Sequence, residues 1–165
     1  MTMTRWLRHL FSGHWQVQRA FPDAALSNIE LAIRQTEATH SGQIRFAVEA
    51  GLDIAPLLKN QTARERAIEV FSQLRVWDTE GNNGVLIYVL LADHDVEIIA
   101  DRGIDKQVGV EQWETICRAM ETAFRAGRFE QGVVDGIKAI DAHLERHYPK
   151  HGEGINELPD SPTVL

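Results

Sequence analysis

The sequence predicts an α/β fold: a single-domain α-β-α-β-β-α-α sandwich with a small mixed sheet covered by helices. Two runs of strand character, at 43–49 and 85–91, are separated by a segment with helical spacing of its apolar residues. A third strand-like run at 96–100 follows the second after a short turn, as in a β-hairpin. Two segments with helical spacing complete the pattern. Alternating strands and helices of this kind favour a sheet with helices packed on it.

The first 22 residues form a basic segment that is rich in aromatic and aliphatic side chains. Residues 1–20 contain Arg5, Arg8 and Arg19 and no acidic residue, whereas the remainder holds 14 basic against 24 acidic residues. Two interpretations are open. The segment is either an amphipathic surface that contacts an anionic membrane peripherally through residues 1–20, or an extra helix or mobile arm of the domain.

The first helix of the domain is expected from about Ser27 to Thr39. Ser27 and Glu30 have the spacing of a capping box, in which each side chain satisfies a free backbone amide at the helix start. Ser41 and Gly42 then break the helical pattern. In the run 43–49, apolar residues alternate with other residues, which predicts a half-buried strand.

A second capping box, Thr62 to Glu65, predicts the start of the next helix. Turn-forming residues fill 78–84. The continuous apolar run 85–91 predicts a central strand that is covered on both faces. Residues 96–100 are expected to return beside it as the second strand of a hairpin that closes at Asp101.

Two further helices are expected, one ending at Gly127 and one stopped by Pro149. Beyond it the chain shows little periodicity, which predicts a flexible tail. The chain therefore divides into a basic N-terminal segment (1–22), an α/β domain (23–149) and a C-terminal tail (150–165).

Composition excludes several classes of function. The net charge of −7 makes nucleic acid an improbable partner, because phosphate backbones bind basic surfaces. The single Cys117 excludes an internal disulfide and a cysteine metal cluster, and its helical surroundings suggest a small buried residue. No membrane span or signal peptide is evident, so a cytoplasmic location is expected, either free or peripheral to the membrane. Glycine-rich phosphate and dinucleotide motifs are absent, so no organic cofactor is expected.

Acidic and amide side chains gather at one end of the predicted hairpin. Because its strands are antiparallel, the residues that precede the first strand lie beside those that follow the second. Hard oxygen ligands on converging loops suit Ca²⁺ or Mg²⁺. The alternative is a pair of ordinary solvated turns. The predicted metal ligands are Asp78, Glu80, Asn83, Asp101 and Asp105.

Three stretches together resemble the TPM domain family, which includes thylakoid-lumen proteins associated with photosystem repair. They are 63–71, the run 83–89 that begins Asn-Gly-Val-Leu, and 96–104 with its Ala-Asp-Arg-Gly element. Trp113 and the Phe and Gly residues between 124 and 136 continue the resemblance over roughly residues 26–148. Gln43 departs from the pattern, because relatives commonly have Glu there. His94 stands where an Arg is frequent.

The resemblance implies the α/β sandwich described above. It also implies divalent-cation binding or acid phosphatase activity, since both have been ascribed to parts of the family. A membrane-protein partner, either LemA-like or a membrane-anchored TPM protein, is implied in the same way. We expect a non-enzymatic binding or accessory domain, because no nucleophile and base are evident. The alternative is a metal-assisted phosphohydrolase, in which Asp78 and Asp101 hold the ion and Arg102 steadies the phosphate oxygens.

Overall fold

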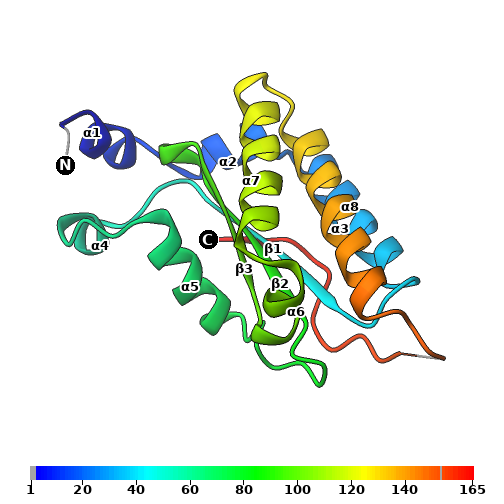
Figure 1. The fold of residues 1–165 in the computed structure, drawn as a ribbon. Helices are drawn as coiled ribbons and strands as arrows, with labels where there is room; N and C mark the ends of the chain where they lie inside the picture. The colour runs from blue at the N-terminus through cyan, green and yellow to red at the C-terminus, as the bar shows by residue number, and fades with distance from the viewer. Residues whose placement is uncertain (1–2, 153) are drawn as a thin grey trace.

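A four-stranded mixed sheet forms the centre of the protein in the computed structural model, which describes residues 3–152 and 154–165 (Figure 1). The strands are β1 (Gln43–Glu49), β2 (Gly84–Leu90), β3 (Asp95–Ala100) and β4 (Thr163–Val164), in the order β3-β2-β1-β4. β1 pairs in parallel with β2 and with β4, and β2 pairs antiparallel with β3. The predicted sandwich, central strand and hairpin are confirmed.

Both central strands are buried on both faces. Every residue of β1 and of β2 is buried. The prediction that 43–49 would be half-buried is therefore wrong, because its non-apolar members are covered as well: Arg45 and Glu49 lie inside and are paired with other groups. A two-sided sheet of this kind needs a layer on each face.

Three helices cover one face of the sheet: α3 (Asp23–Thr36), α7 (Val110–Arg125) and α8 (Phe129–His147). They enclose the larger core cluster with the side chains of β1 and β2 that point to that face. Glycine at 136 allows α7 and α8 to approach closely, because an added Cβ there would stand 2.5 Å from the sulfur of Met120. Burial of this layer is the main apolar contribution to stability.

The other face is covered by α5 (Ala63–Gln73), which starts with the predicted capping box of Thr62 and Glu65. Beneath this helix a buried polar group links three elements. The Glu49 carboxylate accepts hydrogen bonds from Arg66 of α5, at 2.9 and 3.0 Å, and from the hydroxyl of Tyr88 of β2, at 2.6 Å. Burial and the nearby Glu49 charge raise the pKa of Tyr88. The phenol therefore remains a proton donor to Glu49.

Several helix boundaries differ from the sequence expectation. α3 begins at Asp23, with Pro22 as its N-cap residue, so Ser27 lies inside the helix and no capping box forms there. The helix thus starts directly after Pro22, four residues before Ser27, and Asp23 places an acidic side chain in its first turn. Residues 101–108 do not merely close the hairpin, because Asp101 caps a further short helix, α6 (Arg102–Val108).

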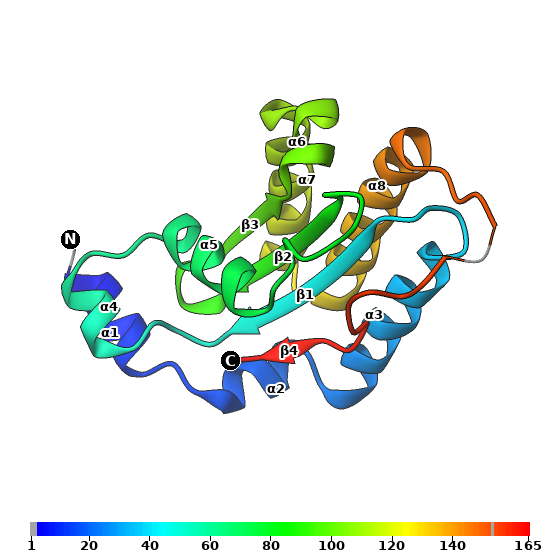
Figure 2. The same ribbon diagram turned by 90° about the horizontal axis from the view of Figure 1, so that it is seen from below.

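The basic N-terminal segment is helical. It forms α1 (Met3–Leu10) and α2 (His14–Ala20), and α4 (Ile54–Leu58) lies near α1 at the same end of the molecule (Figure 2). A 3₁₀ turn, Leu91–Asp93, connects β2 to β3 and packs against α1. In the described part of the chain, no helix combines the length and apolar character that a membrane crossing requires.

The C-terminal segment differs from the flexible tail that its sequence suggests. β4 runs alongside β1 at the sheet edge (Figure 2). Gln43 of β1 accepts hydrogen bonds at its side-chain oxygen from the amides of Glu157 and Leu158, at 3.1 and 2.9 Å. Arg45 donates to the carbonyl of Pro159 and to the Thr163 hydroxyl. Contacts of this kind leave no periodic signal in the sequence.

The Glu49 group generates a stability prediction. Replacing Tyr88 with Phe removes the hydroxyl donor and leaves a buried carboxylate with one fewer partner, so the free energy of unfolding should fall by about 2 kcal/mol. Urea denaturation followed by circular dichroism measures this change. The protein's other tyrosine supplies the control, and Tyr148→Phe should change stability by less than about 0.5 kcal/mol. Equal losses in the two variants would contradict the assigned role of Tyr88.

A second prediction concerns the junction of α3 with the C-terminal segment. Burial, together with the charge of Asp160, raises the pKa of Glu37 from 4.5 to about 7. The folded state therefore holds this proton more tightly than the unfolded state, and the stability contributed by the neutral group is lost as the pH rises from 4.5 through about 7. Glu37→Gln should raise the melting temperature at about pH 8 and leave it nearly unchanged at about pH 4. A melting temperature that responds equally at both pH values would exclude this linkage.

Candidate functional site

Two loops meet at the end of the sheet where β2 begins and β3 ends. The hairpin register pairs Val85 with Ala100, so residues 78–83 lie beside 101–105. The amide of Asp101 donates to the carbonyl of Gly84 at 2.8 Å, and the amide of Ile104 donates to the carbonyl of Asn82 at 3.3 Å. The expected proximity of the two loops is therefore confirmed.

Two oxygen atoms in these loops are buried without a hydrogen-bond partner among the described residues. One is Oδ2 of Asp101, whose other oxygen, Oδ1, caps α6 by accepting from the amide of Arg102 at 2.7 Å. The second is Oδ1 of Asn83, a residue that is only 1% exposed. A buried acceptor without a donor is unfavourable by roughly 1–3 kcal/mol, and by more when it is charged. These two atoms are thus suited to a ligand that supplies positive charge.

Backbone carbonyls and a phenol surround the same place. A Cβ atom added at Gly103 would clash with the carbonyl oxygen of Asn82. It would also lie 3.0 Å from the carbonyl oxygen of Gly81 and 2.7 Å from the hydroxyl of Tyr148. Glycine therefore permits the close approach of the loop 81–83 to α6. Burial, and then the charge of Asp101, raise the pKa of Tyr148. The loops thus combine a carboxylate, an amide oxygen and backbone carbonyls.

The carboxylates of two remaining predicted ligands have other partners, and the third, Glu80, is exposed. Asp78 pairs with Arg75 at 2.5 Å, and Asp105 accepts from the indole of Trp113 at 3.0 Å. The backbone amide of Glu80 donates to the Glu157 carboxylate at 2.9 Å. Over residues 3–152 and 154–165, no three His, Cys, Asp or Glu side chains are grouped so that they could hold an ion. The structure brings Asp101 and Asn83 into one loop pair and engages Asp78 and Asp105 elsewhere.

Arg102 lies at the rim of the same loop pair. Its Nε donates to the side-chain oxygen of Asn82 at 3.4 Å. None of the ion pairs within the described ranges involves Arg102. The guanidinium group therefore retains donors for an anionic ligand.

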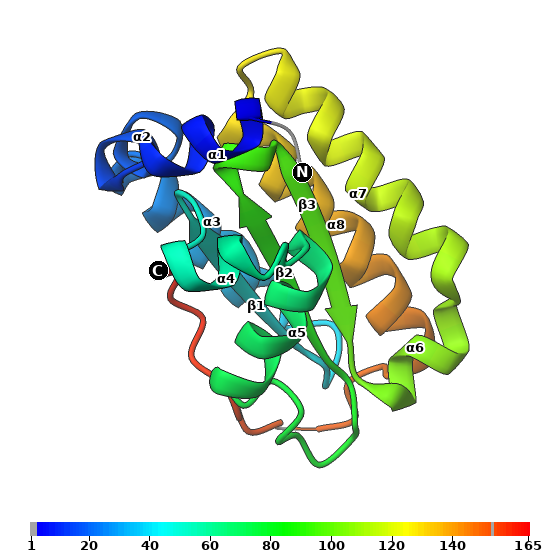
Figure 3. The same ribbon diagram turned by 90° about the vertical axis from the view of Figure 1, so that its left-hand side faces the viewer.

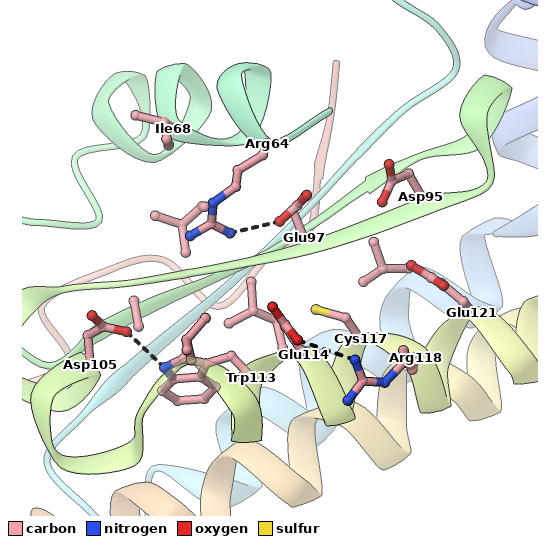
Figure 4. A pocket seen from close by; sticks show the side chains of 15 residues that line it. Arg64, Ile68, Asp95, Glu97, Asp105, Trp113, Glu114, Cys117, Arg118 and Glu121 are labelled. Carbon is pink, nitrogen blue, oxygen red and sulfur yellow. Dashed lines mark hydrogen bonds and ion pairs between the residues drawn. The ribbon is translucent and has the colours of Figure 1, made fainter. Parts of the chain in front are cut away.

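A separate hollow of about 480 Å³ lies along the outer strand β3, between α5 and α7 (Figure 4). Its arginines are engaged: Arg64 with Glu97 at 2.9 Å and Arg118 with Glu114 at 3.3 Å. Burial raises the pKa of the Cys117 thiol to about 12, so it is protonated at neutral pH. Cys117 is partly buried, whereas the sequence suggests a buried residue, and its protonated thiol is a weak nucleophile because only the thiolate is a strong one.

A group at the opposite end of the sheet left no recognisable sequence signal. Asp93, expected only in a hairpin turn, accepts hydrogen bonds from Arg5 at 2.8 Å and contacts Nε2 of His9 at 3.0 Å. Burial opposes ionisation of Asp93, but the hydrogen bonds from Arg5 and His9 keep its pKa below the ordinary value. The partners are more than 80 residues apart in sequence, so spacing could not reveal them.

Comparison with known proteins agrees with this architecture. The BA42 protein of the psychrophilic bacterium Bizionia argentinensis, solved by NMR, is 34% identical to this chain with a TM-score of 0.75. The similarity covers 86% of this chain and 93% of that protein. The N-terminal domain of a protein from P. gingivalis, also solved by NMR, shares the fold at 17% identity and a TM-score of 0.59, over 78% of this chain and 81% of that one.

No curated protein sequence matches the chain. The family model described as the TPM domain matches residues 17–143, which is most of the chain. The sequence elements around the hairpin, the fold and this match agree with one another. The chain therefore belongs to the TPM domain family.

Proposed function

We propose that this TPM domain is a non-enzymatic binding module that takes up a divalent cation, Ca²⁺ or Mg²⁺, in the loop pair 78–83 and 101–105. One observation carries the proposal: Oδ2 of Asp101 and Oδ1 of Asn83 are buried acceptors without partners among the described residues. A cation held in the loop pair would supply the positive partner that these acceptors lack. Asp101 supplies the negative charge and Asn83 a neutral oxygen, which is a donor set that hard cations accept.

The supporting backbone is already constrained. Asp101 is held by α6 through its Oδ1 atom and by β2 through its amide. The loop that carries Asn83 is held by the bond from the Asn83 amide to the Thr79 hydroxyl, at 3.1 Å. Carbonyls of Gly81 and Asn82 lie close to Gly103 and are additional oxygen donors in this region. Water can complete the ligand number that Ca²⁺ or Mg²⁺ requires.

The proposal predicts a charge-dependent affinity. Asp101→Asn retains an N-cap residue of equal quality, so α6 should form normally while the carboxylate is lost. We expect Ca²⁺ affinity, measured by calorimetry, to fall at least about tenfold, because each lost 1.4 kcal/mol of interaction is a factor of ten. In the wild type, amide NMR signals of residues 81–83 and 101–104 should shift with a saturable dependence on Ca²⁺.

Asp78→Asn is the matched control, because it removes an exposed carboxylate from the same loop pair that is already paired with Arg75. It should change Ca²⁺ affinity by less than about twofold, as expected for a surface group. Absence of any saturable response to Ca²⁺ or Mg²⁺ in the wild type would overturn the cation site. Equal losses in Asp78→Asn and Asp101→Asn would overturn the assignment of Asp101.

The accessory role is proposed from family membership. A LemA-like protein or a membrane-anchored TPM protein is the partner that we expect for a binding module of this kind. The proposed cation would alter the surface charge of the loop pair and so regulate that contact. Crosslinking of this protein to native membranes, followed by pull-down, tests the accessory role. Recovery of an integral membrane protein supports this role, and recovery of none contradicts it.

A second candidate function, a metal-assisted phosphohydrolase, is favoured by the position of Arg102 beside the same loops. There the cation would polarise a phosphate oxygen and Arg102 would bind the remaining oxygens. This candidate function predicts that the protein hydrolyses p-nitrophenyl phosphate. The rate should fall at least about tenfold in Arg102→Gln, because a charged contact to the transition state is lost. Arg118→Gln, an exposed arginine of α7, is the control. Equal rates in the wild type and both variants would exclude this activity.

A further inference from the structure

Helix α1 has its polar side turned toward the protein. Arg5 donates to the carboxylate of Asp93, at 2.8 Å, and to the carbonyl of Gln61, also at 2.8 Å. His9, one turn further along, is 4% exposed. Its Nδ1 accepts from the amide of Leu52 at 2.9 Å, which fixes the proton on the Nε2 atom that faces Asp93. These bonds fix the rotation of α1 about its axis.

The same rotation turns the apolar side of α1 toward solvent. Leu7 is 48% exposed, Leu10 57% and Phe11, directly after the helix, 71%. Trp15 at the start of α2 is 58% exposed. Residues spaced by three and four share one face of a helix, and a helix of a globular protein normally buries such a face. We call these four residues the apolar patch; contiguous exposed patches of this kind mark interaction sites.

Cationic side chains border the apolar patch. A groove of about 670 Å³ between α1, α2 and the 91–94 turn is lined by Phe11 and Trp15 together with Arg8, Arg19 and His94. Among the ion pairs of the described residues, a single acidic residue, Asp93, contacts α1, and it is engaged by Arg5, His9 and, at 3.6 Å, Arg8. Residues 1–20 contribute three arginines and no acid. The surface therefore combines apolar, aromatic and cationic groups.

We propose that α1 and α2 form a peripheral docking surface for an anionic phospholipid membrane. Leu, Phe and Trp side chains enter the boundary between headgroups and acyl chains, while arginines contact the lipid phosphates. An acidic protein would suit the arginines, but it would leave the four exposed apolar side chains Leu7, Leu10, Phe11 and Trp15 without apolar partners, which the interface of a bilayer supplies. Charge complementarity with anionic lipid, combined with these exposed apolar side chains, thus favours the membrane.

The charge of the whole protein gives this docking a direction. Beyond residue 20 the chain holds 14 basic against 24 acidic residues, so the rest of the molecule is repelled by an anionic surface. α1 and α2 lie at one end of the sheet, and α6 with the proposed cation loops lies at the other (Figure 3). The domain would therefore contact the membrane through α1 and α2, with the proposed cation loops facing away from the membrane.

Vesicle flotation of the full chain tests the proposal. Vesicles of phosphatidylcholine with phosphatidylglycerol should bind the protein at least about tenfold more strongly than pure phosphatidylcholine, and added salt should weaken binding. Two double variants should each lower the partition coefficient of the protein onto these vesicles at least about fivefold: Phe11→Ser with Trp15→Ser, and Arg8→Gln with Arg19→Gln. Circular dichroism and melting temperature verify that these surface variants fold.

Matched controls come from exposed residues elsewhere. Trp77→Ser removes a tryptophan that is 48% exposed, and Arg118→Gln with Arg125→Gln removes two exposed arginines of α7. Both controls should bind vesicles as the wild type does. Absence of binding, equal binding to neutral and anionic vesicles, or equal losses in controls and test variants would overturn the proposal. A wild type that binds an acidic polypeptide, polyglutamate, but no vesicle would instead indicate a protein partner. These results are independent of the cation titration.

Discussion

Burial of the parallel β1–β2 pair on both faces is the constraint on which the rest of the structure depends. Two adjacent strands without an exposed side chain need a layer above, a layer below and cover along the open edge of β1. α3, α7 and α8 supply the first layer, and α5 supplies most of the second. The C-terminal segment supplies the edge cover by adding β4 in parallel to β1.

The polar groups inside this sheet determine how the covering elements are placed. Glu49 fixes α5 through Arg66, and Gln43 and Arg45 fix the C-terminal segment. Each buried polar side chain would be unfavourable without its partner, so these bonds specify position as well as contributing stability. The side-chain oxygen of Gln43 accepts two amide hydrogens of the C-terminal segment, and so Gln43 acts in holding that segment.

The two proposed sites lie at opposite ends of the sheet for a topological reason. β1 and β2 run in the same direction, so their starts meet the end of β3 at the loops 78–83 and 101–105. Their ends meet the 91–94 turn, against which α1 is held by Asp93. A membrane contact at one end therefore leaves the proposed cation loops accessible to solvent at the other.

The sequence by itself determined the strands, the hairpin, the long helices and the proximity of Asp101 to the loop at 83, because periodicity and strand direction are local properties. Only the tertiary structure decided that Asp78 and Asp105 are engaged by Arg75 and Trp113, whereas Asp101 and Asn83 each keep a buried oxygen without a partner among the described residues. It also decided the attachment of residues 157–165 and the outward apolar face of α1. Those features depend on bonds between residues far apart in sequence, which no spacing rule records.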